Sequence, residues 1–467
     1  MNNMKKSARR VFWLLALCFF LLLGYLGKLA LVDREEISAN SYNIRMRTDV
    51  DGIQRGDILD KNGEVLATSV QQEDGSYLRE YNRARMAAHI TGYSSVGKTG
   101  VEAAANFELM TPYRELLQRI QGLLSGTDPR GNDVVLAVDM DIQSIAGDLL
   151  GSAKGAVVVM EPSTGRVLAM QAYPDFDPNT VSADWEYLVS DEDSPLVNRA
   201  TQGLYPPGST FKTITALAAM EYFPDWQNFT YTCTGEEEFQ DKVIHCYNNR
   251  AHGTVDMAGA MAASCNCYFA ALAEEIGADN LSKEMEACGI TADYGFDLAY
   301  SNSIMHLNAD STESELVETA IGQGKTSVSP LYMAMLISAI ANDGIMMEPY
   351  IIDHMQYYNG ETGKTTVPNK LMSICTPEEA AALKEMLIGV VESGTGTAAQ
   401  ISGVTVAGKT GTAENATGKD HSWFVGYAPA EDPQVSIAVI IENSEAYGSA
   451  TPIAGKVLKA ALEKMAE

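Results

Sequence analysis

Residues 206–212 read PPGSTFK, and this short stretch decides how the rest of the sequence is interpreted. Two prolines and a glycine stop one segment, and a helical run then opens at Ser209. Positions i and i+3 share one face of a helix, so the Ser209 hydroxyl and the Lys212 amine are expected to lie close together. The pair predicts a serine nucleophile with a base one turn away, although the same spacing also occurs where a capped helix carries a surface lysine.

Two further motifs follow in a fixed order. Fifty-five residues after Ser209 comes Ser264-Cys265-Asn266, and 145 residues after that comes Lys409-Thr410-Gly411, continued by Thr412. The first of these joins two helical stretches, and the second falls in the apolar run 404–413, which predicts a strand. S-x-x-K, S-x-N and K-T-G in this order are the signature of penicillin-binding proteins and serine β-lactamases.

The chain resembles class B penicillin-binding proteins over nearly its whole length. The similar stretches are Arg55–Gly63 (RGDILDKNG), Val157–Ala172, Pro174–Asn179 (PDFDPN), Ala251–Gly253, Gly322–Gly324 and Trp423–Gly426. The resemblance implies an α/β (α+β) transpeptidase fold of the penicillin-binding and serine β-lactamase type. It also implies peptidoglycan D,D-transpeptidase activity through an acyl-serine intermediate. β-Lactams are expected to bind covalently to the same serine. The motifs are common to enzymes of division, elongation and sporulation.

The same resemblance assigns roles to residues. It implies a catalytic set of Ser209, Lys212, Ser264 and Asn266 and a substrate-binding set of Lys409, Thr410, Gly411 and Thr412. Ser264 would relay a proton to the leaving amine, and Lys409 with the threonine hydroxyls would hold the terminal carboxylate. Backbone N–H groups of Ser209 and Thr412 would form the oxyanion hole. No cofactor is expected.

The N-terminus predicts a membrane anchor. Val11–Gly27 holds seventeen residues without a charge, and the apolar run continues past Lys28 to Val32. Such a length is typical of a membrane-spanning helix, and Lys28 can reach the interface. A cleaved signal peptide would usually have a shorter apolar core, and no A-x-A site follows Val32. A lipoprotein cysteine at Cys18 is disfavoured because bulky Leu17 precedes it.

The charge pattern and the apolar runs predict the order of domains. Four basic residues precede the apolar run, which puts the N-terminus in the cytoplasm and the remainder outside. We predict a cytoplasmic tail (1–10), a transmembrane anchor (11–32), a small mixed pedestal domain (33–135) and a transpeptidase domain (136–467). Strand-like runs at 155–160, 167–172, 404–413, 421–429 and 434–443 flank a helical middle, which predicts one sheet closed by the two ends of this domain. A pedestal of about a hundred residues resembles that of short class B members and is too short for a glycosyltransferase domain.

Composition excludes several kinds of partner and site. The net charge is −28, and residues 11–467 alone carry −32 once the four basic residues of the tail are removed. A negative field of this size repels phosphate backbones, so no nucleic acid partner is expected. The expected partners are stem peptides, β-lactams, the membrane and, by resemblance, a multi-pass glycan polymerase.

The seven cysteines and six histidines contain no CxxC or HExxH motif, so we expect no metal site. Cys233 and Cys246 flank an acidic loop outside the membrane, and we predict that they form a disulfide. Cys265 is interpreted as a small packing residue within the S-x-N motif.

A nucleotide-binding protein is the alternative from a different class. Gly92–Thr99 (GYSSVGKT) and Gly403–Thr410 (GVTVAGKT) both match the phosphate-loop pattern GxxxxGK[ST]. Both matches are expected outside the membrane, where nucleotide is scarce, and the second lies on a predicted strand without a following helix. The glycines of the first match are equally explained as turns of the pedestal.

A β-lactamase shares all three motifs and is the nearest rival. Class A β-lactamases carry an extra glutamate in an E-x-x-L-N stretch. The only Leu-Asn pair here is Leu307-Asn308, and the residue three before Leu307 is Ile304, which cannot act as a base. An inactive scaffold that keeps the fold is disfavoured because the three motifs are intact.

Overall fold

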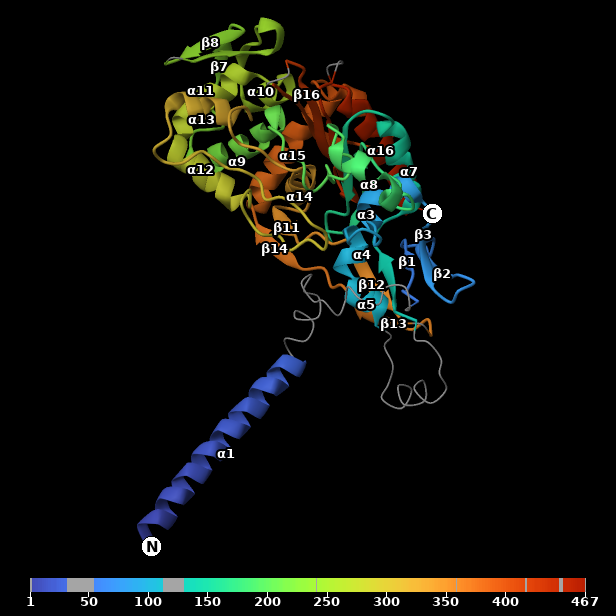
Figure 1. Cartoon of the computed structure of the whole chain (residues 1–467). Coiled ribbons are helices and arrows are strands. Elements are labelled where there is room, and N and C mark those ends of the chain that lie inside the picture. Colours follow the sequence, from blue (N-terminus) through green and yellow to red (C-terminus); the bar gives the residue numbers. More distant parts are fainter. Residues whose placement is uncertain are drawn as a thin grey trace.

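The computed structural model describes residues 2–31, 54–111, 130–240, 242–357, 359–415, 418–444 and 448–466 (Figure 1). Parts of the predicted pedestal, residues 33–53 and 112–129, lie outside the described residues, as does Val32 at the end of the predicted anchor. Helix α1 (Asn2–Leu31) covers the predicted tail and most of the predicted anchor. Among the described residues, no helix has both the length and the apolar content needed to cross a bilayer.

A five-stranded antiparallel sheet forms the centre of the C-terminal part. Its order is β15 (Ala407–Ala413), β16 (His421–Ala428), β17 (Val435–Ile441), β5 (Gly155–Met160) and β6 (Val167–Tyr173). The pairing of β17 with β5 joins the two ends of this part of the chain, which confirms the predicted closure. Every residue of β5, β16 and β17 is buried because helices cover both faces of the sheet.

Two layers of helices enclose this sheet. On one face, α7 (Met140–Leu150) and α16 (Ala450–Met465) pack together and share a core cluster with β16 and β17. On the other face lie α14 (Pro330–Ala341) and α15 (Pro377–Glu392). All twelve residues of α14 are buried, which is expected of a helix that is apolar on all sides.

The remaining elements form the site region and its surroundings. They are α8 (Val181–Ser190), η2 (Gly208–Phe211), α9 (Lys212–Tyr222), β7 (Tyr231–Cys233), β8 (Glu236–Phe239), β9 (Lys242–His245), η3 (Tyr247–Asn249), β10 (Gly253–Val255), α10 (Met257–Ala263), α11 (Asn266–Ile276), α12 (Ala278–Ala287), α13 (Glu313–Ala320), β11 (Ile345–Met347), β14 (Lys370–Ser373) and η4 (Thr397–Ala399). The hairpin of β8 and β9 lies at the end of the molecule away from β12 and β13 (Figure 1).

A second sheet is built from distant parts of the chain. Its order is β13 (Thr362–Thr365), β12 (Ile352–Gln356), β4 (Asp133–Leu136), β1 (Ile58–Leu59), β2 (Val65–Gln71) and β3 (Tyr77–Tyr81). Helices α3 (Ala84–Thr91), α4 (Gly100–Ala104) and α5 (Asn106–Met110) lie in the same part of the chain. Two of the six strands come from residues 352–365, so the N-terminal sheet is completed by the C-terminal part of the chain.

A buried ion cluster stabilises this second sheet. Glu102 has no exposed surface and accepts hydrogen bonds from the guanidinium groups of both Arg55 and Arg79, with 2.6 Å between Arg79 Nε and Glu102 Oε1. Burial is the largest single influence on the pKa of Glu102 and raises it, but the charges and hydrogen bonds of Arg79 and Arg55 together outweigh burial and lower this pKa. Arg55, which opens the RGDILDKNG stretch, is therefore a structural residue in this fold.

Replacement of Glu102 with alanine is expected to destabilise the protein. The change leaves two buried guanidinium groups without their shared carboxylate, which costs about 3–5 kcal/mol of unfolding free energy. Chemical denaturation of the full chain in detergent measures the loss, and Glu73→Ala, at an exposed position, is the matched control. Equal stability of the two variants would show that the cluster contributes nothing net.

Candidate active site

Ser209 lies in a tight turn that is fixed against strand β15. The turn is the 3-10 segment η2, and α9 continues directly from it at Lys212, as the S-x-x-K spacing predicts. Gly208 has a φ of +54°, and a Cβ atom there would lie 2.4 Å from the Thr412 carbonyl oxygen. Only glycine permits this approach, which places the partly exposed Ser209 beside the K-T-G strand.

Ser264 and Asn266 lie at the junction of two helices. Ser264 ends α10 in the left-handed conformation, with a φ of +54°, and α11 begins at Asn266. Lys212 Nζ lies 3.3 Å from Ser264 Oγ and 2.6 Å from Asn266 Oδ1, and it also donates to the Ser264 carbonyl at 2.8 Å. The helix junction therefore brings the S-x-N motif to the lysine of S-x-x-K.

Lys409 approaches the same serine hydroxyl from the sheet. Its Nζ lies 2.9 Å from Ser264 Oγ and donates to the Thr410 carbonyl at 3.0 Å. Lys212 and Lys409 both have 0% exposed surface, so the Ser264 hydroxyl lies between two buried amines. The structure thus gathers all three motifs around one hydroxyl group.

Burial governs the protonation of both lysines. It lowers the pKa of Lys212 to about 8, although neighbouring cysteine thiols act in the opposite direction. The pKa of Lys409 lies well below its usual range, first because of burial and then because of the charge of Lys212. Repulsion between the two amines thus acts on Lys409, whereas burial is the source of the shift at Lys212.

The motifs open into one cavity of about 590 Å³. Its lining includes Ser209, Ser264, Asn266, Thr410 and Thr412. The three motifs therefore supply two serine hydroxyls, one amide and two threonine hydroxyls to the lining of this cavity.

Gly411 plays a different part from its neighbours. A Cβ atom there would lie 2.9 Å from Trp423 Cβ and 3.1 Å from the Pro207 carbonyl oxygen. Gly411 therefore allows β15 to pack closely against the Ser209 turn, and it offers no side chain to a ligand.

Thr395 and Gln323, which lie outside the three motifs, also line this cavity. Thr395 follows α15, and its Oγ1 lies 2.6 Å from Thr410 Oγ1. Gln323 donates from Nε2 to the Thr412 carbonyl at 3.5 Å. Gln323 belongs to a stretch that the sequence singled out, whereas Thr395 had no signal apart from its glycine-rich loop, in which Gly394 packs against the Ala262 carbonyl.

The phosphate-loop matches are explained by other structure. Lys409 and Thr410 of the second match lie within strand β15, which confirms the objection raised from the sequence. In the first match, Gly92 has a φ of +72°, and a Cβ atom would lie 1.9 Å from the Thr99 carbonyl oxygen. The helix that follows, α4, has only five residues. The glycines of the first match therefore serve a tight turn, as the pedestal interpretation predicts.

The predicted disulfide between Cys233 and Cys246 is wrong for this structure. Both are free thiols with 3.6 Å between their sulfur atoms, whereas a disulfide needs about 2.0 Å. His252 and Cys265 lie beside the same two thiols, so the four side chains could hold a metal ion. The sequence-based expectation of no metal site relied on the lack of closely spaced ligands, and it did not anticipate this gathering of distant ones.

The Ser209 turn, two buried lysines and a K-T-G strand at a sheet edge are the features of a serine acyltransferase of the penicillin-recognising class. Two known domain families match this chain, and both belong to penicillin-binding proteins. The transpeptidase domain of penicillin-binding proteins matches residues 155–463, and the dimerisation domain of penicillin-binding protein A matches residues 55–134.

Individual relatives are similar along most of the chain. Peptidoglycan D,D-transpeptidase PbpA of Mycolicibacterium smegmatis is 33% identical, covering 99% of this chain and 100% of the relative. A crystal structure of the D,D-transpeptidase domain of an Eggerthella lenta peptidoglycan glycosyltransferase is 38% identical with a TM-score of 0.82, covering 89% of this chain and 99% of that one. The ceftriaxone acyl-enzyme complex of Mycobacterium tuberculosis penicillin-binding protein A is 33% identical with a TM-score of 0.82, covering 88% and 99%. The chain therefore belongs to the class B penicillin-binding proteins, the peptidoglycan D,D-transpeptidases.

Proposed function

We propose that this chain is a membrane-anchored D,D-transpeptidase that cross-links peptidoglycan stem peptides on the outer side of the membrane, with Ser209 as nucleophile. The observation that carries the assignment of roles is the Ser264 hydroxyl between Lys212 Nζ at 3.3 Å and Lys409 Nζ at 2.9 Å. This arrangement offers a path for a proton between a buried amine and a molecule in the cavity.

Acylation begins when Ser209 Oγ attacks the D-Ala–D-Ala carbonyl carbon and gives its proton to neutral Lys212. The tetrahedral oxyanion accepts hydrogen bonds from the backbone N–H groups of Ser209 and Thr412, each worth about 3 kcal/mol in such sites. The C–N bond then breaks, and the leaving amine takes a proton through Ser264. An ester on Ser209 and free D-alanine result.

Deacylation repeats these steps with a different amine. The amine of a neighbouring stem attacks the ester, its proton returns to Ser209 Oγ, and a new amide cross-link forms. During the earlier acylation, before D-alanine leaves, Lys409 with the Thr410 and Thr412 hydroxyls holds the terminal carboxylate of the donor, and Asn266 orients the donor backbone. A protonated Lys409 would form an ion pair with this negatively charged carboxylate.

The experiment that tests this function supplies the full chain, in detergent, with nascent glycan carrying pentapeptide stems. We expect release of D-alanine together with dimeric muropeptides, and loss of both after pretreatment with penicillin. Release of D-alanine without dimers would make the protein a carboxypeptidase instead.

The acylation rate is expected to rise with pH. Only neutral Lys212 can accept the proton from Ser209, and with a pKa of about 8 it is roughly one-tenth neutral at pH 7. The second-order rate constant for penicillin acylation should therefore increase roughly fifteenfold between pH 6.5 and 8 and level off above about pH 9. Stopped-flow labelling measures it, with circular dichroism as the control for folding. A flat profile in this range would exclude Lys212 as the base.

The anchor is supported by the apolar segment within α1. Val11–Gly27 is free of charge, and the described large apolar side chains of this helix are exposed, with Phe12 at 63% and Leu22 at 60%. Four basic residues before the segment favour a cytoplasmic N-terminus. Fractionation and protease protection of the full chain test this topology, and a chain released from membranes by salt alone would contradict it.

We further propose that the anchor (11–32) and the pedestal (33–135) contact a multi-pass glycan polymerase, which makes the strands that this chain cross-links. A chain without these two regions should fail to rescue a depletion strain. Rescue with normal localisation would remove the polymerase from the proposal.

A further inference from the structure

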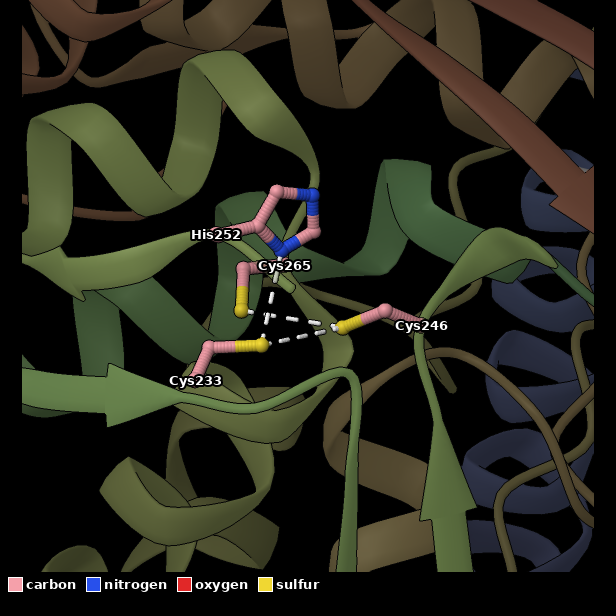
Figure 2. Close-up of side chains that lie close together, drawn as sticks. All are labelled: Cys233, Cys246, His252 and Cys265. Atoms are coloured by element: carbon pink, nitrogen blue, oxygen red, sulfur yellow. Dashed lines mark hydrogen bonds between the residues drawn. The ribbon is translucent and has the colours of Figure 1, made fainter. Parts of the chain in front are cut away.

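Four metal-ligating side chains converge beside the S-x-N motif (Figure 2). Cys233 ends β7, Cys246 follows β9, His252 precedes β10, and Cys265 is the N-cap of α11. Their ligand atoms all lie within 4.8 Å of one another. The three cysteines are at most 2% exposed. Residues spread over more than thirty positions thus meet at one point, which no single turn or hairpin would require.

The distances within this cluster are those of a tetrahedral zinc site. Zinc–sulfur bonds of about 2.3 Å place two sulfur ligands about 3.8 Å apart, and a sulfur and an imidazole nitrogen about 3.6 Å apart. The Cys246 sulfur lies 3.6 Å from that of Cys233 and 3.8 Å from that of Cys265. The Cys233 sulfur lies 3.5 Å from His252 Nδ1.

We propose that Cys233, Cys246, His252 and Cys265 bind one zinc ion. Three thiolates and one imidazole are a ligand set typical of structural zinc, and four protein ligands leave no position for a reacting water. On binding, the three thiols release three protons to solvent, and His252 coordinates through the Nδ1 lone pair with its proton on Nε2. The site is therefore structural.

The backbone around the cluster holds the ligands in place. The register of β10 with β7 pairs Gly253 with Cys233, which brings His252 next to the first ligand. The Cys265 sulfur accepts a hydrogen bond from the Tyr268 backbone N–H at 3.4 Å, at the N-terminal end of α11, where negative charge is favoured. Ligands oriented before binding are expected in a structural site.

Cys267 is a fifth cysteine close to the cluster, but it lies outside the ligand set. Its sulfur is 3.6 Å from the Cys246 sulfur and donates to the Ile244 carbonyl at 3.7 Å. The four ligand atoms that all approach one another do not include it.

The proposed ion would connect the wall of the cavity to the catalytic motif. Cys265 lies between Ser264 and Asn266, and residues 245–250 and His252 line the same cavity as Ser209. Asn266 Nδ2 also donates to the His245 carbonyl at 2.7 Å, and this hydrogen bond joins the S-x-N motif directly to the cavity wall at residues 245–250. Zinc would make this connection rigid and hold Ser264 in its left-handed conformation.

A disulfide between Cys233 and Cys246 is the competing state of these thiols. It would require their sulfur atoms to approach from 3.6 Å to about 2.0 Å and would remove two of the four ligands. The observed separation is that of two ligands on one ion.

The test measures metal in the full chain, purified in detergent with a reducing agent and without added chelator. Mass spectrometry of the metals is expected to find about one zinc per chain. Cys233→Ser and His252→Ala should lower this content at least several-fold, whereas Cys375→Ser, at a cysteine outside the cluster, should not change it. Equal zinc in all four proteins, or none in any of them after incubation with Zn²⁺, would overturn the proposal.

A second measurement, the absorption spectrum of the unaltered chain with Co²⁺ in place of Zn²⁺, tests the proposal even if the variants do not fold. Unaltered chain reconstituted with Co²⁺ should show the visible bands of tetrahedral cobalt and thiolate charge-transfer bands in the near ultraviolet. Thiol titration in denaturant with chelator should find all seven cysteines as thiols, whereas a disulfide would leave only five. A mass two daltons below that of the reduced chain, with no cobalt bands, would identify the disulfide instead.

Removal of the ion should also slow acylation by penicillin several-fold, and Zn²⁺ but not Mg²⁺ should restore the rate. Metal content and cobalt spectra need no penicillin, so they can fail or succeed independently of the proposed transpeptidase function. Zinc that is bound and removed without any change in the acylation rate would overturn the proposed link between the ion and the Ser264 motif.

Discussion

Ser209→Ala is expected to abolish covalent labelling of the chain by penicillin. In the proposed reaction the Ser209 hydroxyl supplies the oxygen of the ester that joins antibiotic and protein, and alanine at this position has no atom that can form that bond. Labelling should fall by more than about a thousandfold, to the level of unreacted chain. Fluorescent penicillin measures the loss in gels, and mass spectrometry of the unaltered chain should find the adduct on the peptide that contains Ser209.

Lys409→Ala is the matched control for this experiment. Lys409 donates a hydrogen bond to Ser264, and its proposed role is to hold the substrate carboxylate without forming a covalent bond, so its loss should weaken labelling without removing it. Persistent labelling of Ser209→Ala would contradict the assignment of the nucleophile. No labelling of the unaltered, folded chain would identify an inactive scaffold.

The acyl-enzyme formed with penicillin is expected to last for many minutes, which separates this protein from a β-lactamase. Both kinds of enzyme form the ester on serine, and fast hydrolysis then needs a second base that directs water at it. Leu307 and Asn308, the only candidate for the E-x-x-L-N stretch, do not line the cavity that contains Ser209. Deacylation should therefore be at least about a thousandfold slower than the turnover of a β-lactamase, which often exceeds one per second.

Intact-mass measurements of the full chain after removal of free penicillin give the lifetime of the adduct. Glu414 and Asp420 are carboxylates that line the cavity, at the turn between β15 and β16, so they need a control. Turnover of many penicillin molecules per second, lost in Glu414→Gln or Asp420→Asn, would reassign the protein as a β-lactamase.

Most of the catalytic sheet could be predicted from local pattern. The predicted strand at 155–160 agrees with β5 in its bounds, and those at 421–429 and 434–443 agree with β16 and β17 to within two residues at each end. These strands are buried on both faces, so their sequences are continuous apolar runs that stand out from their surroundings. The N-terminal sheet was harder, because β12 contains Asp353 and His354 and joins β4 across more than two hundred residues. A short polar strand carries no signal for such a distant partner.

The sequence by itself determined the family, the nucleophile turn and the order of the three motifs, because each motif is short and its spacing depends on one local element. Only the tertiary structure decided that Lys212 and Lys409 both meet the Ser264 hydroxyl and are fully buried, since their desolvation depends on side chains from distant helices and strands. It also decided the state of the cysteines. Cys233 and Cys246 were interpreted as a pair because they flank one loop, whereas the fold adds His252 and Cys265 to them. Ligands separated by 13, 6 and 13 positions leave no local motif, because they come together only when the β7–β10 pair and the end of β9 pack against the start of α11.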